Sequence, residues 1–320
     1  MPLDPILAPM LAAMPPLPAV IDDLGAYRAE ENAGAAASVD SVMEPAPEGA
    51  TRRIVEIPVE GGIIDLHIFT PDTPGPHPGH LYLHGGGWIG GSIKHKSVDI
   101  LCTERAVLAD CVVVTAEYRK APEHQFPVGL NDSYAALLWM DEHADELGIR
   151  RDLITVGGGS AGANLAAAVA LKARDENGPR LALQILDVPA LDLTMTAPSF
   201  ERNATGYGLT TAYAKAVADL YLASPEDARN PYASPLLAED LSGLPPAYIL
   251  PAEYDPLCDD GAAYAARLEE AGVPVTLSLQ RGQFHGSSLL TKVLPAARSW
   301  RDESIAALRA AHAVDATSDS

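Results

Sequence analysis

The sequence has few positive charges, few cysteines and no long apolar run. Its 320 residues include 22 Lys and Arg against 43 Asp and Glu, which gives a net charge of −21 with histidine neutral. A surface this acidic repels phosphate backbones and anionic lipid head groups, so neither nucleic acid nor a membrane is an expected partner. Because no uninterrupted stretch of about 18 apolar residues occurs, no membrane-spanning helix is expected.

Only three cysteines are present, at Cys102, Cys111 and Cys258. They form no C-x-x-C pair and no Cys/His cluster with zinc spacing, so no metal site is expected. The first basic residue is Arg28, and prolines interrupt the apolar residues before it, which is unlike a secretory signal peptide. We therefore expect reduced, mostly buried thiols in a cytoplasmic protein.

The amino-terminal residues 1–50 are rich in alanine, proline and acids and are too irregular to form a core alone. The segment 17–31 is compatible with a short amphipathic helix, and 38–51 with a linker. The remaining composition, 48% hydrophobic and 20% charged, is typical of a soluble globular domain. A chain of this length can form one large α/β domain with insertions.

From Arg52 onward, short apolar runs alternate with helical patterns. Two β-rich runs, 53–59 and 63–69, flank Gly61-Gly62 and predict an antiparallel hairpin, with Pro58 favouring an edge position for the first strand. Further strands are expected at 80–83, 111–116, 153–156, 181–186, 247–250 and 275–279, and helices near 94–109, 128–147, 161–175, 259–272 and 287–311. This alternation predicts a doubly wound α/β fold with a mostly parallel sheet.

Residues 191–241 interrupt this alternation with a helical piece at 210–222 and a proline-rich connector. We interpret 1–50 and the insertion 191–225 as parts of a helical cap over the sheet edge where active sites lie. The catalytic domain would then comprise 51–190 and 226–312. The tail 313–320 is expected to be disordered.

The segment after the 153–156 strand contains the most informative motif. Gly158-Gly-Ser160-Ala-Gly162 fits G-x-S-x-G and precedes an alanine-rich helix. In such an elbow a strained turn exposes the serine hydroxyl, and small flanking residues let strand and helix approach. Two alternatives remain open: Gly157, Gly159 and Gly162 also fit a nucleotide-binding G-x-G-x-x-G turn, or they only pack closely. Against the nucleotide turn, several strands precede this one and no acid ends a strand about 20 residues later.

A second glycine cluster, His84-Gly-Gly-Gly-Trp88, directly follows the 80–83 strand. Alone it could be a loose turn. Together with Ser160 it suggests an oxyanion hole, because acyl transfer develops negative charge on a carbonyl oxygen and backbone N–H groups stabilise it. We expect the donors to be the N–H groups of Gly85, Gly86 and Ala161.

A serine nucleophile of this type needs an acid and then a histidine later in the chain. His285 follows the last predicted strand, whereas His312 lies in the polar tail, where we expect it to be exposed. Asp255 is the first acid in the loop after the 247–250 strand. Glu253, still in the strand's terminal run, and Asp259, in the first turn of the next helix, remain alternatives.

These segments together resemble the bacterial hormone-sensitive-lipase-like branch of the α/β-hydrolase carboxylesterases. The resemblance covers about residues 50–300 and rests on five motifs in order: His84-Gly-Gly-Gly-Trp88, Tyr118-Arg-Lys-Ala-Pro-Glu-His124 with Phe126-Pro127, Gly158-Gly-Ser-Ala-Gly162, Asp255-Pro-Leu257 and Phe284-His-Gly286. It implies an α/β-hydrolase fold with about eight strands and a helical cap.

The resemblance implies Ser160 as nucleophile, His285 as base and Asp255 as the acid that orients it. It also implies a structural role for His84. Two positions depart from the family pattern: Gly159 replaces the usual Asp or Thr, and Ala163 replaces a glycine.

The same resemblance leads us to expect internal ion pairs from Arg119 and Glu123. Trp88, Tyr207 and Tyr213 are candidates for the substrate pocket.

The sequence thus predicts a serine carboxylesterase for short- to medium-chain esters, without metal or cofactor. The same triad would serve an amidase, a lactonase or an acyltransferase. A binding protein on this scaffold and a nucleotide-dependent oxidoreductase are less consistent with a complete triad. An exposed strand at 275–279 is compatible with a homodimer.

Overall fold

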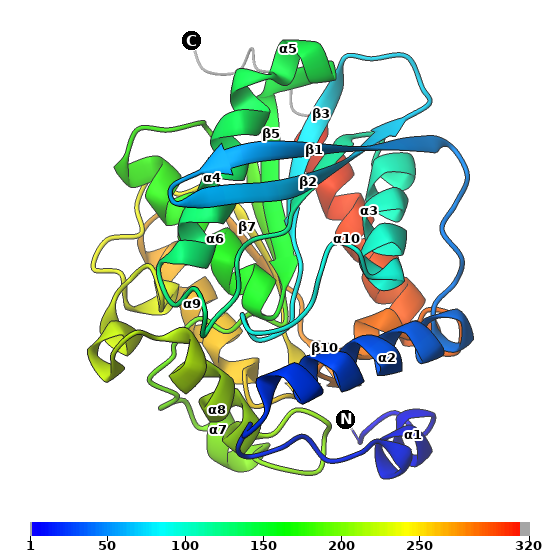
Figure 1. Cartoon of the computed structure of the whole chain (residues 1–320), viewed down its shortest axis with the longest axis vertical. Helices are drawn as coiled ribbons and strands as arrows, with labels where there is room; N and C mark the ends of the chain where they lie inside the picture. Colours follow the sequence, from blue (N-terminus) through cyan, green and yellow to red (C-terminus); the bar gives the residue numbers. More distant parts are fainter. Residues whose placement is uncertain (1, 314–320) are drawn as a thin grey trace.

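The predicted strands form one eight-stranded sheet at the centre of the molecule (Figure 1). The computed structural model describes residues 2–313. The sheet order is β1-β2-β4-β3-β5-β6-β7-β9. In chain order these strands are β1 (Ala50–Val59), β2 (Gly62–Pro71), β3 (His77–Leu83), β4 (Val112–Ala116), β5 (Ile149–Gly159), β6 (Leu183–Asp187), β7 (Ala247–Leu250) and β9 (Val275–Leu277).

The hairpin prediction is confirmed. Strands β1 and β2 pair antiparallel, with Val59 opposite Gly62, and β2 pairs antiparallel with β4. From β4 to β9 every pairing is parallel. Strand β1 lies at one edge of the sheet, so the missing N–H of Pro58 leaves no ladder bond unmade. Strand β9 forms the other edge.

Helices cover both faces of the sheet, as a doubly wound fold requires. On one face α3 (Lys96–Leu108) and α10 (Pro295–His312) pack against residues such as Val113. On the other face α4 (Val128–Glu142) packs against β4, α6 (Ala161–Asp175) against β3, β5 and β6, and α9 (Cys258–Glu270) against β7 and β9. The central strands are therefore buried on both sides, which explains their unbroken apolar sequences.

Shorter elements complete the chain. These are helix α5 (Ala144–Leu147), three 3-10 turns at Pro225–Arg229, Pro235–Leu237 and Ser287–Leu289, and a separate two-stranded sheet of β8 (Ala252–Tyr254) and β10 (Gln280–Phe284). The small sheet was not predicted, because its strands are short and lack an apolar run.

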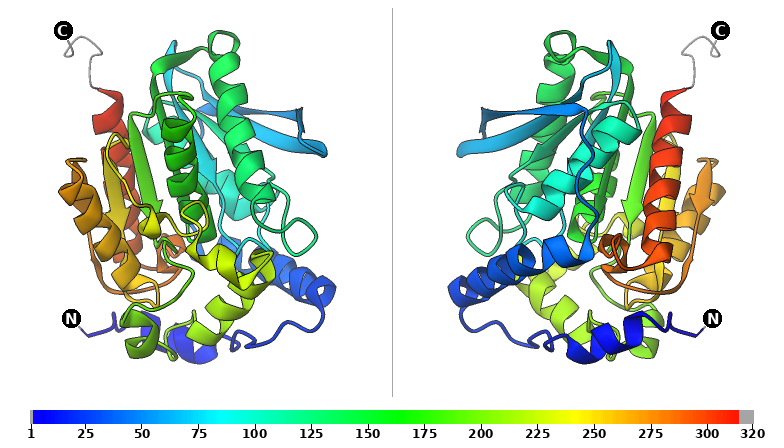
Figure 2. Two further views of the ribbon diagram at one scale, coloured as in Figure 1. Left: turned by 90° about the vertical axis from the view of Figure 1, so that its left-hand side faces the viewer. Right: turned by 90° about the vertical axis from the view of Figure 1, so that its right-hand side faces the viewer.

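The two irregular regions of the sequence come together at one end of the molecule. Helices α1 (Leu7–Ala13) and α2 (Leu24–Val42) lie there beside α7 (Ser199–Arg202) and α8 (Thr211–Tyr221), as both views in Figure 2 show. Across this junction the hydroxyl groups of Tyr27 and Tyr213 are 2.5 Å apart. This contact between residues 1–50 and the 191–225 insertion is the arrangement that a cap built from both segments would need.

The expected bounds of the first long helix were wrong. Helix α2 begins seven residues after position 17, at Leu24, and continues to Val42, into the first part of the expected linker. The Asp23 carboxylate accepts a hydrogen bond from the Ala26 N–H and so caps the helix start. Alanine-rich sequence then propagates the helix until Pro45 and Pro47 approach. Helix α1 was not expected, because Pro9 lies within it, but proline is tolerated in a first turn.

The last helix was also placed wrongly. The expected 287–311 helix is a 3-10 turn followed by α10, which begins at Pro295 because proline fits only the first turn of a helix. His312, expected to be exposed, is 9% exposed and lies on the buried side of α10. The predicted tail lies outside the described residues beyond Ala313.

The three cysteine thiols are free and buried. Among the helices within residues 2–313, none combines the length and the apolar character needed to span a membrane.

Two buried histidines next to β5, His80 and His312, predict that the stability of the fold decreases at acid pH. The hydroxyl of Thr155 lies 2.9 Å from His80 Nδ1 and 3.3 Å from His312 Nε2. Burial lowers the pKa of His312 to about 4, and burial with Arg105 nearby also lowers the pKa of His80. Both rings fold neutral but become charged in the unfolded chain below about pH 6.5, so stability is complete above that pH and falls as pH drops towards 4.

We expect His312→Gln to lose less stability than the wild type on going from pH 7.5 to pH 5. The difference for this one group is about 2 kcal/mol in the free energy of unfolding. Urea unfolding at the two pH values measures it, with exposed His124→Gln as the matched control. An equal loss in wild type and His312→Gln would contradict the assignment.

Candidate active site

Ser160 lies on a strained turn between β5 and α6. Its φ of 57° and ψ of −120° are unusual for a residue with a side chain. The turn is possible only with small neighbours: a Cβ on Gly158 would lie 2.4 Å from the Leu83 carbonyl oxygen, and one on Gly162 only 2.0 Å from it. The G-x-S-x-G spacing therefore has a steric cause, and the serine hydroxyl emerges at the carboxyl ends of the parallel strands.

Gly157 does not belong to a nucleotide-binding turn. It lies inside β5, opposite Ile185 of β6, and a Cβ there would be 2.3 Å from the Ile185 side chain. Position 157 therefore requires glycine because β5 and β6 pack closely there. Within residues 2–313, no three His, Cys, Asp or Glu side chains are placed to hold a metal ion.

The structure brings Ser160, His285 and Asp255 into one chain of hydrogen bonds. The distance from His285 Nε2 to Ser160 Oγ is 3.0 Å, and from His285 Nδ1 to Asp255 Oδ2 it is 2.7 Å. The Asp255 side chain is buried, and its Oδ1 accepts a hydrogen bond from the Leu257 N–H at 2.9 Å. The carboxylate therefore faces the imidazole with a fixed orientation.

The small β8–β10 sheet is what brings the acid and the histidine together. Strand β8 ends one residue before Asp255, and β10 ends one residue before His285. The strands are parallel, with Phe284 opposite Tyr254. Because paired parallel strands end at the same edge, the two following side chains meet.

The environment of His285 raises its pKa. Burial alone would lower the value, but the negative charge and hydrogen bond of Asp255, with a contribution from Asp187, outweigh burial. The imidazolium form is thus stabilised by nearby carboxylates.

The alternative acids and the second histidine lie elsewhere. Asp259 pairs with Arg202 at 2.7 Å, and Glu253 Oε2 accepts a hydrogen bond from the Gly282 N–H at 2.7 Å. His312 contacts Thr155 beneath the sheet. Within residues 2–313, neither Asp259 nor His312 has a hydrogen bond to His285 or Ser160.

The glycine loop after β3 lies against the nucleophile. A Cβ on Gly85 would be 2.9 Å from the Gly159 carbonyl oxygen, and Gly86 has a φ of 124° that favours glycine. Both line the cavity that contains Ser160 and His285. Ala161 is the first residue of α6, and first-turn N–H groups have no acceptor within their helix. These three N–H groups are thus close to Ser160 in the chain or in space.

Aromatic stacking supports this loop from behind. The His84 ring stacks on Tyr118 with centroids 4.4 Å apart, and its Nδ1 donates to the Gly85 carbonyl at 2.7 Å. The Tyr118 hydroxyl donates to the His84 carbonyl at 2.9 Å. Burial, together with the charge of Lys120, lowers the His84 pKa to about 4, so the ring is neutral near pH 7.

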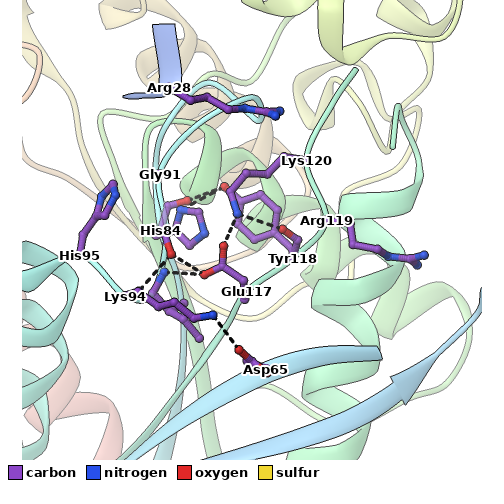
Figure 3. Close-up of polar contacts among 12 residues, drawn as sticks. Arg28, Asp65, His84, Gly91, Lys94, His95, Glu117, Tyr118, Arg119 and Lys120 are labelled. Carbon is purple, nitrogen blue, oxygen red and sulfur yellow. Dashed lines mark hydrogen bonds and ion pairs between the residues drawn. The ribbon is translucent and has the colours of Figure 1, made fainter. Parts of the chain in front are cut away.

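A network of charged residues connects this support to neighbouring elements (Figure 3). Glu117 accepts hydrogen bonds from Lys120 and from the Ser92 hydroxyl. The expected ion pairs are present: Arg119 pairs with Asp132 at 2.7 Å.

Glu123 pairs with Arg28 of α2, also at 2.7 Å. Arg28 additionally donates to the carbonyls of Ile89 and Ala121. Helix α2 is therefore hydrogen-bonded to the segment that follows the glycine loop.

A cavity of about 420 Å³ contains Ser160 and His285. Trp88 and Tyr213 are among its lining residues, although Trp88 is 4% exposed and stacks on Tyr221. Tyr207 is not among the lining residues, and its ring packs against Tyr254 at 4.7 Å. Sequence reasoning missed Asp187, which lines the cavity from the end of β6. Its only sequence signal is a carboxylate directly after an apolar strand.

Comparisons with known proteins agree with this geometry. A family described by its α/β hydrolase fold matches residues 80–289. Esterase LipI of Mycobacterium tuberculosis is 36% identical over 315 residues, covering 96% of this chain and 94% of LipI. Carboxylesterase NlhH of the same species is 43% identical over 238 residues, covering 73% of this chain and 74% of NlhH.

Solved structures give the same result. A hyperthermophilic esterase from the archaeon Pyrobaculum calidifontis superposes with a TM-score of 0.90 at 35% identity, covering 97% of this chain and 99% of that one. A bacterial heroin esterase has a TM-score of 0.89 at 38% identity and covers 98% of both chains. The chain therefore belongs to the hormone-sensitive-lipase-like branch of the α/β-hydrolase family and is a carboxylic ester hydrolase.

Proposed function

We propose that Ser160 attacks the ester carbonyl while His285 accepts its proton through Nε2. The observation that supports these roles is the unbroken series of hydrogen bonds from Ser160 through His285 to Asp255. Asp255 holds the Nδ1–H tautomer and stabilises the imidazolium that forms. His285 then protonates the leaving alcohol, and water attacks the acyl-enzyme by the same route.

The developing oxyanion would accept hydrogen bonds from the N–H groups of Gly85, Gly86 and Ala161. Each such donor typically contributes 10²–10³-fold in rate. The stacked His84 and Tyr118 side chains take no part in the chemical steps. They support the loop that carries two of these donors.

Short- to medium-chain carboxylic esters are the proposed substrates. The cavity volume of about 420 Å³ suits a small molecule, and much of its wall is apolar, including Leu209 and Val217. The cap formed by 1–50 and 191–225 is proposed to cover this cavity.

Compartment and assembly are further proposals. Three free, buried thiols fit a reducing, cytoplasmic environment. Strand β9 leaves a sheet edge where Leu277 is 43% exposed, which would suit pairing with a second copy of the chain.

Replacing Ser160 by Ala should reduce kcat by about 10⁶-fold, because it removes the nucleophile. The measurement is 4-nitrophenyl butyrate hydrolysis, combined with fluorophosphonate labelling followed by mass spectrometry. Ser288→Ala, which removes another hydroxyl from the same cavity wall, is the matched control and should still be labelled. A near-wild-type rate for Ser160→Ala would overturn the assignment.

Activity should rise with pH as His285 loses its proton. Because its pKa is raised above 6.5, the midpoint of the kcat/KM profile should lie above pH 6.5. The rate of fluorophosphonate labelling should follow the same curve. Asp255→Asn should lower the plateau by about 10⁴-fold. A midpoint below pH 6 in both assays would contradict this role for His285.

A series of 4-nitrophenyl esters from C2 to C16 tests the substrate size. We expect kcat/KM to be highest for short or medium acyl chains, because a cavity of about 420 Å³ limits the length of chain that it can hold. A maximum at C16 would refute the proposed size range.

A further inference from the structure

Asp187 places in the cavity wall a carboxylate that the proposed mechanism does not use. It is the last residue of β6, and its backbone carbonyl accepts a hydrogen bond from the Ser160 N–H at 2.8 Å. Its side chain lines the cavity together with Ser160 and His285. The carboxylate is therefore held beside the nucleophile by the main chain of the catalytic turn.

This carboxylate has few hydrogen-bond donors. A carboxylate can accept about four hydrogen bonds. Asp187 Oδ2 accepts one, from Ser288 Oγ at 3.3 Å, and the buried Oδ1 has no partner among the described residues. Asp255, by contrast, accepts bonds of 2.7 and 2.9 Å. Burial raises the pKa of Asp187 to about 6, and the charges of Arg105 and His285, together with the Ser288 hydroxyl and the Trp300 indole N–H, limit the rise.

The space in front of Asp187 Oδ2 is left open by Gly159. A Cβ built on Gly159 would meet only Asp187 Oδ2, at 3.9 Å. Here the nucleophile and the carboxylate border the same unfilled space.

The local charge favours a neutral donor over a cation. Arg105 is the main positive influence on Asp187, and it is itself buried, with its guanidinium 4.5 Å from the centre of the Tyr82 ring. The carboxylate charge is thus partly balanced before any ligand arrives. Oδ2 has only the long contact of 3.3 Å with the Ser288 hydroxyl, so it can accept a further hydrogen bond from an O–H or N–H donor in the cavity.

We propose that Asp187 forms a specificity subsite for a substrate hydroxyl group located a few bonds from the ester carbonyl. The hydroxyl occupies the space over Gly159 and donates a hydrogen bond to Asp187 Oδ2. The preferred substrates are therefore hydroxy-substituted esters rather than plain alkyl esters. This inference rests on the proposed function, because the hydroxyl reaches Asp187 only when the carbonyl lies at Ser160.

The expected preference for hydroxy esters over alkyl esters arises because the acceptor, Asp187, is charged. An alkyl ester displaces water from Asp187 without replacing its hydrogen bond, whereas a hydroxy ester restores it. A site that binds a hydroxyl through a charged group typically discriminates by about 10- to 100-fold in kcat/KM.

The test uses two matched pairs of esters on the full-length protein. The 4-nitrophenyl esters of butyrate and of each enantiomer of 3-hydroxybutyrate place the hydroxyl on the acyl side. Propyl acetate and 2-hydroxypropyl acetate place it on the alcohol side. We expect the hydroxy ester to be favoured about tenfold or more in one of the pairs.

Two variants remove the preference by different routes. Asp187→Leu removes the acceptor, and Gly159→Thr fills the space while leaving the carboxylate in place. In both, the ratio of kcat/KM between the paired esters should fall towards one. Because the ratio is taken within each variant, changes in the catalytic groups cancel.

Asp192→Asn is the matched control. Asp192 lines the same cavity, but its Oδ1 already accepts hydrogen bonds from the Thr194 N–H and hydroxyl, at 2.9 and 2.6 Å. This variant should keep the wild-type ratio.

Equal rates within both pairs in the wild type would overturn the subsite and leave the esterase function standing. An unchanged preference in a folded Asp187→Leu or Gly159→Thr variant would also overturn it. Failure of the folded wild type to hydrolyse any ester would overturn the proposed function and the subsite together.

Discussion

The strained backbone at Ser160 is the constraint on which the rest of the site depends. A non-glycine residue with a φ of 57° costs of order 1–3 kcal/mol, which the surrounding structure must offset. Two hydrogen bonds hold the turn: Ser160 N–H to the Asp187 carbonyl at 2.8 Å, and Asn164 N–H to the Ser160 carbonyl at 3.0 Å. Gly158 and Gly162 let the strand, the glycine loop and the helix approach it closely.

The residues around Ser160 come from separate parts of the fold. The main sheet presents Ser160, and the small sheet of β8 and β10 brings Asp255 and His285 together. The glycine loop after β3 is held by the stacked pair of His84 and Tyr118. Arg28 extends this support to helix α2, which is hydrogen-bonded to the segment that follows the glycine loop. Changes in α2 can therefore alter the geometry of the site without contacting the substrate.

Gly159 and Asp187 show how one small substitution changes the space around a shared chemical centre. Gly159 is not among the positive-φ residues, so the turn does not require glycine there. The absent side chain leaves Ser160 and the Asp187 carboxylate on the same cavity. In the proposed subsite, substrate selection would therefore rest on groups outside the triad.

The sequence by itself determined the strands of the main sheet, the elbow and the glycine loop, because unbroken apolar runs and tightly spaced glycines reflect local steric and burial requirements. It ordered Ser160, Asp255 and His285 but left other acids open. Only the tertiary structure selected among them, through pairing of β8 with β10. It also buried His312 and brought Asp187 beside Ser160, since contacts between residues far apart in the chain depend on how strands align and not on local pattern.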